Sequence, residues 1–465
     1  MNSRTHTDLW NAACAAIQEV QDYSKKARDR YMHSGRPLPP TIWTGDGNQV
    51  FTTQDGINAI WELSEAWRSE QSDRKARIAS DRMGQLALRE FGQMLAENGL
   101  EIWADPKEAV RNFKGRLQER LDAAFRDADH YFPCHMIESK EANSFNVGPI
   151  RFLRRLDWLQ HVSTLANSEL AWTEAVRRNW EEGALPPEEK THDAMDASDV
   201  IETTGRCRWI AAVTVKGNEL GRSEERARYA VRLAIDGLGM ALSRTRAMKM
   251  RGPGDELRVT RTGQLSQYHG LGINRGIMID VPDLFAHPPH AEEFISSTQE
   301  LRADIGWAID AMLHLANQID LPTLKQRWCD ALYWFGEARR DATGFTALVR
   351  YGMSLDVLAK GGKAKGITAM LSDLLACQPN DKLLSDGTPI RKVVKKIYED
   401  GRSQLGHGGR PALLEDLPFP RETADDVVRL VLKRYLLNLR RYSGADDPDA
   451  FLKAIPNLVI KSVTN

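Results

Sequence analysis

The sequence predicts a mainly α-helical fold with a smaller α+β unit: a helical N-terminal region, a mixed central segment and a C-terminal helical bundle. Apolar residues recur every three to four positions in the outer parts of the chain, which is the period of an amphipathic helix. In the centre they alternate with the period of two that is typical of a strand. We therefore expect three regions, at residues 1–185, 195–290 and 293–465.

The composition is that of an ordinary globular protein. The 465 residues suffice for two or three domains of roughly 100–200 residues each. Hydrophobic residues make up 42% of the chain, and 12 tryptophans indicate packed cores rather than disorder. The formal net charge of -1 excludes a generally basic coat, so any surface for nucleic acid must be a local patch.

The cysteines and the N-terminus predict a cytoplasmic protein. The five cysteines are odd in number and none has CxxC spacing, which fits a reducing compartment rather than a disulfide framework. The first residues lack the apolar core of a signal peptide. No stretch reaches the ~20 apolar residues that span a bilayer, so we expect no membrane partner.

The N-terminal region shows the helical period clearly in the segment Met83–Leu95. Asn98-Gly99 then marks a helix end. We expect further helices at about 107–128, 148–163 and 166–182. The proline-containing segment Gly183–Pro187 and the acidic residues after it indicate a linker.

The central segment begins with a strand, because apolar residues alternate along Cys207–Val215. A helix is expected over 223–246, since Ser223 and the two glutamates after it make a good helix start. Two more strands are expected at 257–262 and 277–281.

The C-terminal region is again helical. Candidate helices lie at about 293–318, 322–342, 345–360, 366–377, 389–405 and 423–442. Thr388 is expected to cap the helix at 389–405, with Pro389 at its first position.

The helix expected over 389–405 carries the most informative residues of the chain. Its apolar stripe is Ile390, Val393, Val394, Ile397 and Leu405, and its outward positions are Arg391, Lys392, Lys395 and Lys396. From Tyr398 to Gly408 the sequence has the form YxxxRSxxxHG, with Arg402 and His407 five residues apart. Glycines around His407 are expected to end the helix.

This string resembles the signature of the HEPN ribonucleases: an arginine, a polar residue and, a few positions later, a histidine near a helix end. The spacing here is R-x4-H, and Ser403 is the polar residue. The surrounding Tyr and Gly are similar to the Apea-like HEPN proteins. Segments 331–335, 348–358 and 451–455 also resemble parts of that family, in which a glutamate often stands at the position of Asp356. The resemblance spans residues 325–460.

The resemblance implies a metal-independent RNA endonuclease without a cofactor, in which Arg402 and His407 are catalytic. A histidine can accept or donate a proton near neutral pH, and a guanidinium can hold the scissile phosphate. The 2′-hydroxyl of RNA is the nucleophile, so the product is a 2′,3′-cyclic phosphate and DNA is resistant. Ser403 and Asp356 would orient these groups. The residues expected to guide the RNA backbone are Lys395, Lys396 and Arg391.

The resemblance also implies a homodimer through the HEPN domain. Residues five apart on an α-helix lie about 140° apart around its axis, so one helix does not aim both side chains at one point. HEPN proteins bring two motifs together across a two-fold interface. Apea-like members are often associated with bacterial defence against phage. The first 290 residues would then sense a phage-derived or cellular activator and restrain a toxin-like nuclease.

Two other functions stay open at this stage. The HEPN domain would be a non-catalytic dimerisation and sensing module if Arg402 and His407 only contribute to structure. A metalloenzyme would use His130, Cys134 and His135, but their spacing fits no standard zinc pattern, and we expect no metal.

Overall fold

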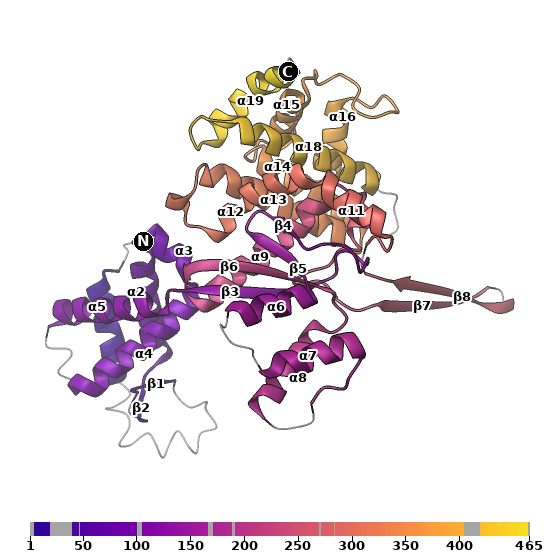
Figure 1. Ribbon diagram of the computed structural model, residues 1–465. Coiled ribbons are helices and arrows are strands. Elements are labelled where there is room, and N and C mark those ends of the chain that lie inside the picture. Colours follow the sequence, from indigo (N-terminus) through magenta and orange to yellow (C-terminus); the bar gives the residue numbers. More distant parts are fainter. Residues whose placement is uncertain are drawn as a thin grey trace. The chain divides into compact units, whose positions relative to one another are not determined.

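The computed structural model describes nine stretches of the chain: 4–18, 40–45, 47–99, 105–165, 171–187, 191–268, 271–282, 284–403 and 419–463. In these stretches the protein is mainly helical with a few small sheets, so the expected fold class is confirmed (Figure 1). The chain forms two compact units, residues 1–128 with 215–225 and residues 129–214 with 226–465. None of the described helices has both the length and the apolar character needed to cross a membrane.

The first unit is a helical core with a two-stranded sheet. Residues 6–18 are helical, and the elements that follow are β1 (Thr41–Trp43), β2 (Gln49–Phe51), α2 (Gln54–Ser69), α3 (Ser72–Arg77), α4 (Ser80–Asn98) and α5 (Pro106–Ala124). The helical period around Met83 lies in α4, where Met83 and Phe91 are fully buried. Phe91 packs edge-on against Trp10, with the ring centroids 4.9 Å apart. The helix expected at these positions is confirmed.

A four-stranded sheet has the order β3-β6-β5-β4. Its strands are β3 (Arg126–Cys134), β4 (Phe145–Val147), β5 (Ile150–Arg154) and β6 (Trp209–Asn218). The strand expected near Cys207–Val215 is β6. The helix expected over 148–163 is wrong in its first part, because β5 precedes α6 (Arg155–Leu165). Gly148 turns the chain between β4 and β5 with a φ of 54°, and a Cβ there would lie 2.4 Å from Gly306. The chain therefore turns and continues as a strand at these positions, although the spacing of its apolar residues is typical of a helix.

The remaining central elements are α7 (Ala171–Glu182), α8 (His192–Thr204), α9 (Leu220–Gly239), α10 (Arg244–Ala247), β7 (Thr260–Tyr268) and β8 (Leu271–Asp280). Helices α6, α7 and α8 pack around Trp158 and Trp180, together with Ile210 of β6. The helix expected over 223–246 is divided between α9 and α10. Strands β7 and β8 form an antiparallel hairpin, which overlaps the strands expected at 257–262 and 277–281 only at 260–262 and 277–280.

The C-terminal region is a helical bundle, as expected. Its elements are α11 (Pro288–Ser297), α12 (Gln299–Leu313), the 3₁₀ turn η2 (Ala316–Gln318), α13 (Pro322–Arg340), α14 (Gly344–Leu358), α15 (Lys363–Leu375), α16 (Ile390–Val394), η3 (Lys395–Ser403), α18 (Arg421–Arg441) and α19 (Pro448–Val463). The single helix expected over 293–318 is divided between α11 and α12. The indole of Trp328 is fully buried in the bundle, and its Nε1 donates to the Leu432 carbonyl at 3.1 Å.

A buried ion pair connects three helices of the bundle. Arg339 of α13 and Asp425 of α18 are 3% and 1% exposed, and two hydrogen bonds of 2.7 Å join them. Tyr351 of α14 donates to the same carboxylate at 2.9 Å. Arg339 also donates to the carbonyl oxygens of Gly239 and Leu242, at and just beyond the end of α9. The network therefore joins the bundle to the central α9.

We expect Asp425→Asn to lower the free energy of unfolding of the second unit by about 3–5 kcal/mol, because it leaves the charge of Arg339 buried without a counter-charge. The double change Arg339→Met with Asp425→Leu buries no charge and should cost much less. Urea unfolding followed by circular dichroism measures both. Equal losses in the single and double variants would contradict this account.

Alkaline pH should destabilise the same bundle. Burial raises the pKa of Tyr351, and the charge of Asp425 raises it further; burial also raises the pKa of Tyr435. A tyrosine in an unfolded chain ionises at about pH 10. The stabilising contribution is therefore complete below about pH 10 and is lost as the pH rises towards the folded-state pKa. The thermal midpoint of the protein should fall above about pH 10, and fall less in the double variant Tyr351→Phe and Tyr435→Phe. An unchanged pH slope in that variant would refute the assignment.

Candidate functional site

Helix α14 packs closely against segment η3 at Gly352. A Cβ at this position would lie 2.6 Å from the Cβ of Arg402 and 3.3 Å from the carbonyl oxygen of Ile397. Only a hydrogen atom fits at such a separation. The contact therefore fixes the backbone of Arg402 against α14.

Two side chains hold the guanidinium of Arg402. Its Nη1 donates to the hydroxyl of Tyr398 at 3.1 Å, and its Nη2 lies 3.3 Å from Oδ2 of Asp356 on α14. The guanidinium carbon also lies 5.2 Å from the centre of the Tyr398 ring. The side chain of Arg402 is 35% exposed, against 15% for Asp356. Among the described residues these contacts use only part of the five-donor fork, and a further acceptor such as a phosphate could bind the other N–H groups.

The carboxylate of Asp356 has an unused acceptor. Its Oδ1 is buried and has no hydrogen-bond partner among the described residues. A buried carboxylate oxygen without a donor is costly, so such an atom calls for a physical explanation. One more N–H or O–H donor, from a side chain or a substrate, would satisfy it.

Tyr398 stays protonated beside this carboxylate. Burial raises the pKa of Tyr398, the negative charge of Asp356 raises it further, and Arg402 opposes the change. At neutral pH the phenol oxygen accepts the hydrogen bond from Arg402 and keeps its own proton to donate. Tyr398 was not among the predicted site residues, although its place in the YxxxRSxxxHG string was a signal.

The segment that carries Arg402 is not an α-helix. Only Ile390–Val394 is α-helical, and η3 is π-helical, with hydrogen bonds between residues five apart. The single α-helix expected over 389–405 is therefore wrong in kind, and its angle of about 140° between residues five apart does not apply within η3. Four residues of the expected apolar stripe are buried: Ile390, Val393, Val394 and Ile397. The fifth, Leu405, lies outside the described residues.

The cap predicted for this helix is also wrong. Thr388 makes no capping hydrogen bond, and the residue before α16 is Pro389. The backbone N–H of Thr388 instead donates to Oδ1 of Asp386 at 2.8 Å.

The other predicted site residues are distributed over several places. Ser403 is half-buried at the end of η3, and Arg391 and Lys395 are exposed. Lys396 is half-buried, with its Nζ 5.6 Å from the centre of the Phe419 ring. His407 lies outside the described residues. Of the predicted set, the structure thus brings Arg402 and Asp356 together.

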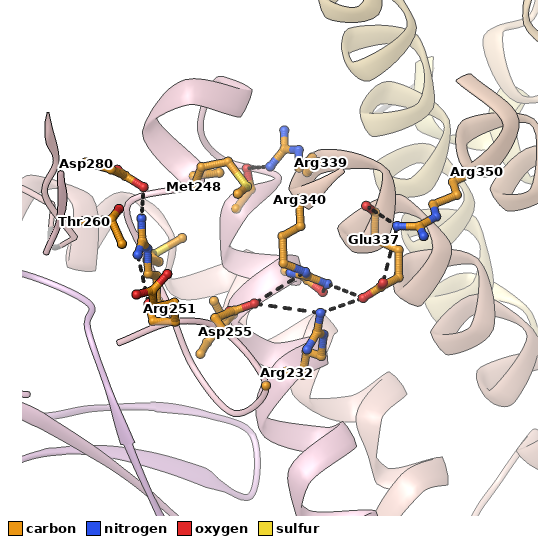
Figure 2. Close-up of a pocket in the computed structure, with 17 residues that line it drawn as sticks. Arg232, Met248, Arg251, Asp255, Thr260, Asp280, Glu337, Arg339, Arg340 and Arg350 are labelled. Atoms are coloured by element: carbon orange, nitrogen blue, oxygen red, sulfur yellow. Dashed lines mark hydrogen bonds and ion pairs between the residues drawn. The ribbon is translucent and has the colours of Figure 1, made fainter. Parts of the chain in front are cut away.

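A cavity of about 400 Å³ in the second unit is a further candidate site, and the sequence analysis did not find it (Figure 2). Arg232 of α9 and Arg340 of α13 line the middle of it, and both donate to Oε1 of Glu337. Arg340 also makes two hydrogen bonds to Asp236, of 2.5 and 3.0 Å. The lining residues span positions 232–350 with no local motif.

The three residues considered as zinc ligands lie in strand β3 or directly after it. His130 and Cys134 lie in β3, and His135 follows it. Nε2 of His135 is 2.8 Å from the carbonyl oxygen of Leu257. Within the described stretches, no group of three or more His, Cys, Asp or Glu side chains is placed to hold a metal ion.

No family model, curated protein or solved structure matches this chain. Any functional assignment therefore depends on the residues of the site and on their geometry.

We expect Gly352→Ala to displace η3 from α14, because the added methyl group would overlap Arg402. Overpacking of this kind costs about 1–3 kcal/mol, so the thermal midpoint should fall by several degrees. Gly366→Ala in α15 is the matched control, because its Cβ would come no closer than 3.7 Å to a neighbour. Scanning calorimetry compares the two. If Gly352→Ala proves as stable as the control, the close approach does not constrain η3.

Proposed function

We propose that the chain is a metal-independent RNA endonuclease of the HEPN type. The proposal rests on the contacts of Arg402, which is the arginine of the R-x4-H string. Asp356 and Tyr398 hold its guanidinium from one side. An arginine fixed in this way offers its other N–H groups to a phosphate without losing further side-chain entropy. Such a cation also offsets the charge that develops on a phosphate during cleavage.

The proposed reaction uses the 2′-hydroxyl of RNA as the nucleophile. Its oxygen attacks the neighbouring phosphorus, the bond from phosphorus to the 5′-oxygen breaks, and a 2′,3′-cyclic phosphate forms. His407 accepts the proton of the 2′-hydroxyl and supplies a proton to the leaving 5′-oxygen. Arg402 holds the non-bridging oxygens of the phosphate. Asp356 and Tyr398 are positioning residues, since they act through Arg402. The roles of His407 and Ser403 come from the family resemblance.

The proposal includes the partners that the resemblance implies. Two copies would pair through the C-terminal bundle and combine their motifs in one cleft. Lys395, Lys396 and Arg391 would attract the RNA backbone. The first 290 residues would respond to a phage-derived or cellular activator in the cytoplasm. The cellular role would then be an antiviral, toxin-like cleavage of host or phage RNA.

The test is cleavage of total cellular RNA by the purified full-length protein in the presence of EDTA. Arg402→Ala and His407→Ala should each reduce the rate by about 10²–10⁴-fold, the usual contribution of an acid–base or charge-stabilising group. Arg434→Ala is the control, since it removes an exposed arginine of α18 that is not part of the R-x4-H string. An oligonucleotide with a 2′-deoxy sugar at the cleaved position should resist, and the RNA product should end in a cyclic phosphate.

Three results would refute the nuclease assignment: full loss of cleavage with EDTA, equal cleavage of the deoxy substrate, or unchanged rates in both variants. If both variants keep every measured property of the parent protein, the C-terminal bundle serves as the non-catalytic dimerisation and sensing module.

A further inference from the structure

The cavity in the second unit is lined by two chemically different sets of side chains, which we call the apolar wall and the charged wall (Figure 2). Its volume of about 400 Å³ lies at the lower end of the range for small-molecule sites, roughly 300–1,000 Å³. Ile235, Ala247, Met248 and Met250 contribute apolar surface. Methionine adapts its shape and makes favourable contacts with aromatic rings. This wall therefore suits a flat, weakly polar ring.

The charged wall is balanced. Five arginines line the cavity, Arg232, Arg251, Arg339, Arg340 and Arg350, and so do five carboxylates, Asp236, Asp255, Glu256, Asp280 and Glu337. A site built for a phosphate would carry an excess of positive charge. Equal numbers of cations and anions instead favour a ligand group that is itself neutral and has both donors and acceptors.

The two arginines at the centre have more donors than the protein satisfies. A guanidinium carries five N–H donors, and Arg232 and Arg340 together make five hydrogen bonds to the described residues, about half of the number that their ten N–H groups could make. Among the described residues, neither Nε atom has a hydrogen-bond partner. Both Nε atoms are buried, so a ligand could reach only the terminal Nη groups of these arginines, and it would need acceptors to bind them.

Asp255 supplies the complementary acceptor. Its Oδ2 accepts from the backbone N–H of Gly252 at 3.2 Å. Its Oδ1 lies 3.8 Å from Nη2 of Arg232 and 3.7 Å from Nε of Arg340, which is too long for a hydrogen bond. This oxygen can receive a donor from a ligand while the two arginines donate to the same ligand.

Guanine has this pattern of groups on one flat neutral ring. Its O6 and N7 accept two hydrogen bonds from an arginine, and its N1–H and N2 amino group donate along the adjacent edge. Adenine has an amino group in place of O6, and the pyrimidines lack the N7 acceptor. We propose that the cavity binds a guanine base, with Arg232 and Arg340 at its acceptor edge and Asp255 at its donor edge. The apolar wall then covers a face of the ring. This inference is independent of the nuclease assignment.

Calorimetric titration of the full-length protein with guanosine tests the proposal. Guanosine should bind, inosine should bind about tenfold more weakly because it lacks the N2 amino group, and adenosine should bind weaker still. Asp255→Asn and Arg232→Gln should each weaken guanosine binding about tenfold or more. Asp193→Asn is the matched control, because it changes an exposed aspartate at the start of α8. The thermal midpoint of each variant shows that it is folded.

Two further ligands identify the source of the base. Tighter binding of guanosine 5′-monophosphate than of guanosine supports a free nucleotide. Binding of a guanine-containing RNA hexamer, but not of its adenine counterpart, with loss in Asp255→Asn, supports a base extended from RNA. Absence of guanosine, nucleotide and hexamer binding at millimolar concentration overturns the proposal. Equal binding of guanosine, inosine and adenosine also overturns it, and this comparison needs no variant.

Discussion

The ion pair between Arg339 and Asp425 is the interaction on which the second unit depends. Two charges are taken out of water in the bundle core, and this is tolerated only because each has several hydrogen-bond partners. Asp425 accepts from Arg339 and Tyr351, and Arg339 also reaches the carbonyl oxygens near the end of α9. Cations are favourable at the C-terminal end of a helix, so the same guanidinium serves two elements. Three helices and α9 are therefore held in one relative arrangement.

Helix α14 transmits this arrangement to both candidate sites. Tyr351 fixes the helix in the core, and Arg350 before it lines the cavity. Gly352 after it meets η3, and one turn later Asp356 pairs with Arg402. Four residues with different roles thus lie within the seven positions 350–356 of α14. This is possible because successive residues of a helix point in different directions. The position of Arg402 consequently depends on how α14 packs in the core, rather than on the conformation of η3 alone.

Patterns that are local in the sequence could be predicted, and contacts between distant segments could not. Helical spacing identified α4 and most of the bundle, because burial of one face needs only the residues of that helix. The β4–β5 turn was missed because it depends on Gly148 meeting Gly306, far along the chain. The π-helical form of η3 was missed because an apolar stripe does not distinguish it from an α-helix. A role for Asp356 beside Arg402 was expected only from the family resemblance, because no local pattern shows that α14 and η3 lie side by side.

Charge balance distinguishes the two candidate sites. Among the described residues Arg402 has one carboxylate partner, and its side chain is about one-third exposed, so part of its charge could act on a phosphate. The arginines of the cavity are matched by an equal number of carboxylates, and a phosphate entering there would meet Asp255 and Glu337 as well. The repulsion between the phosphate and these carboxylates is not offset by surplus arginines. A polyanion should therefore be drawn to Arg402, whereas the cavity selects a neutral ring by its hydrogen bonds. If both proposals hold, an RNA backbone and a guanine base would be recognised at separate places by different physical means.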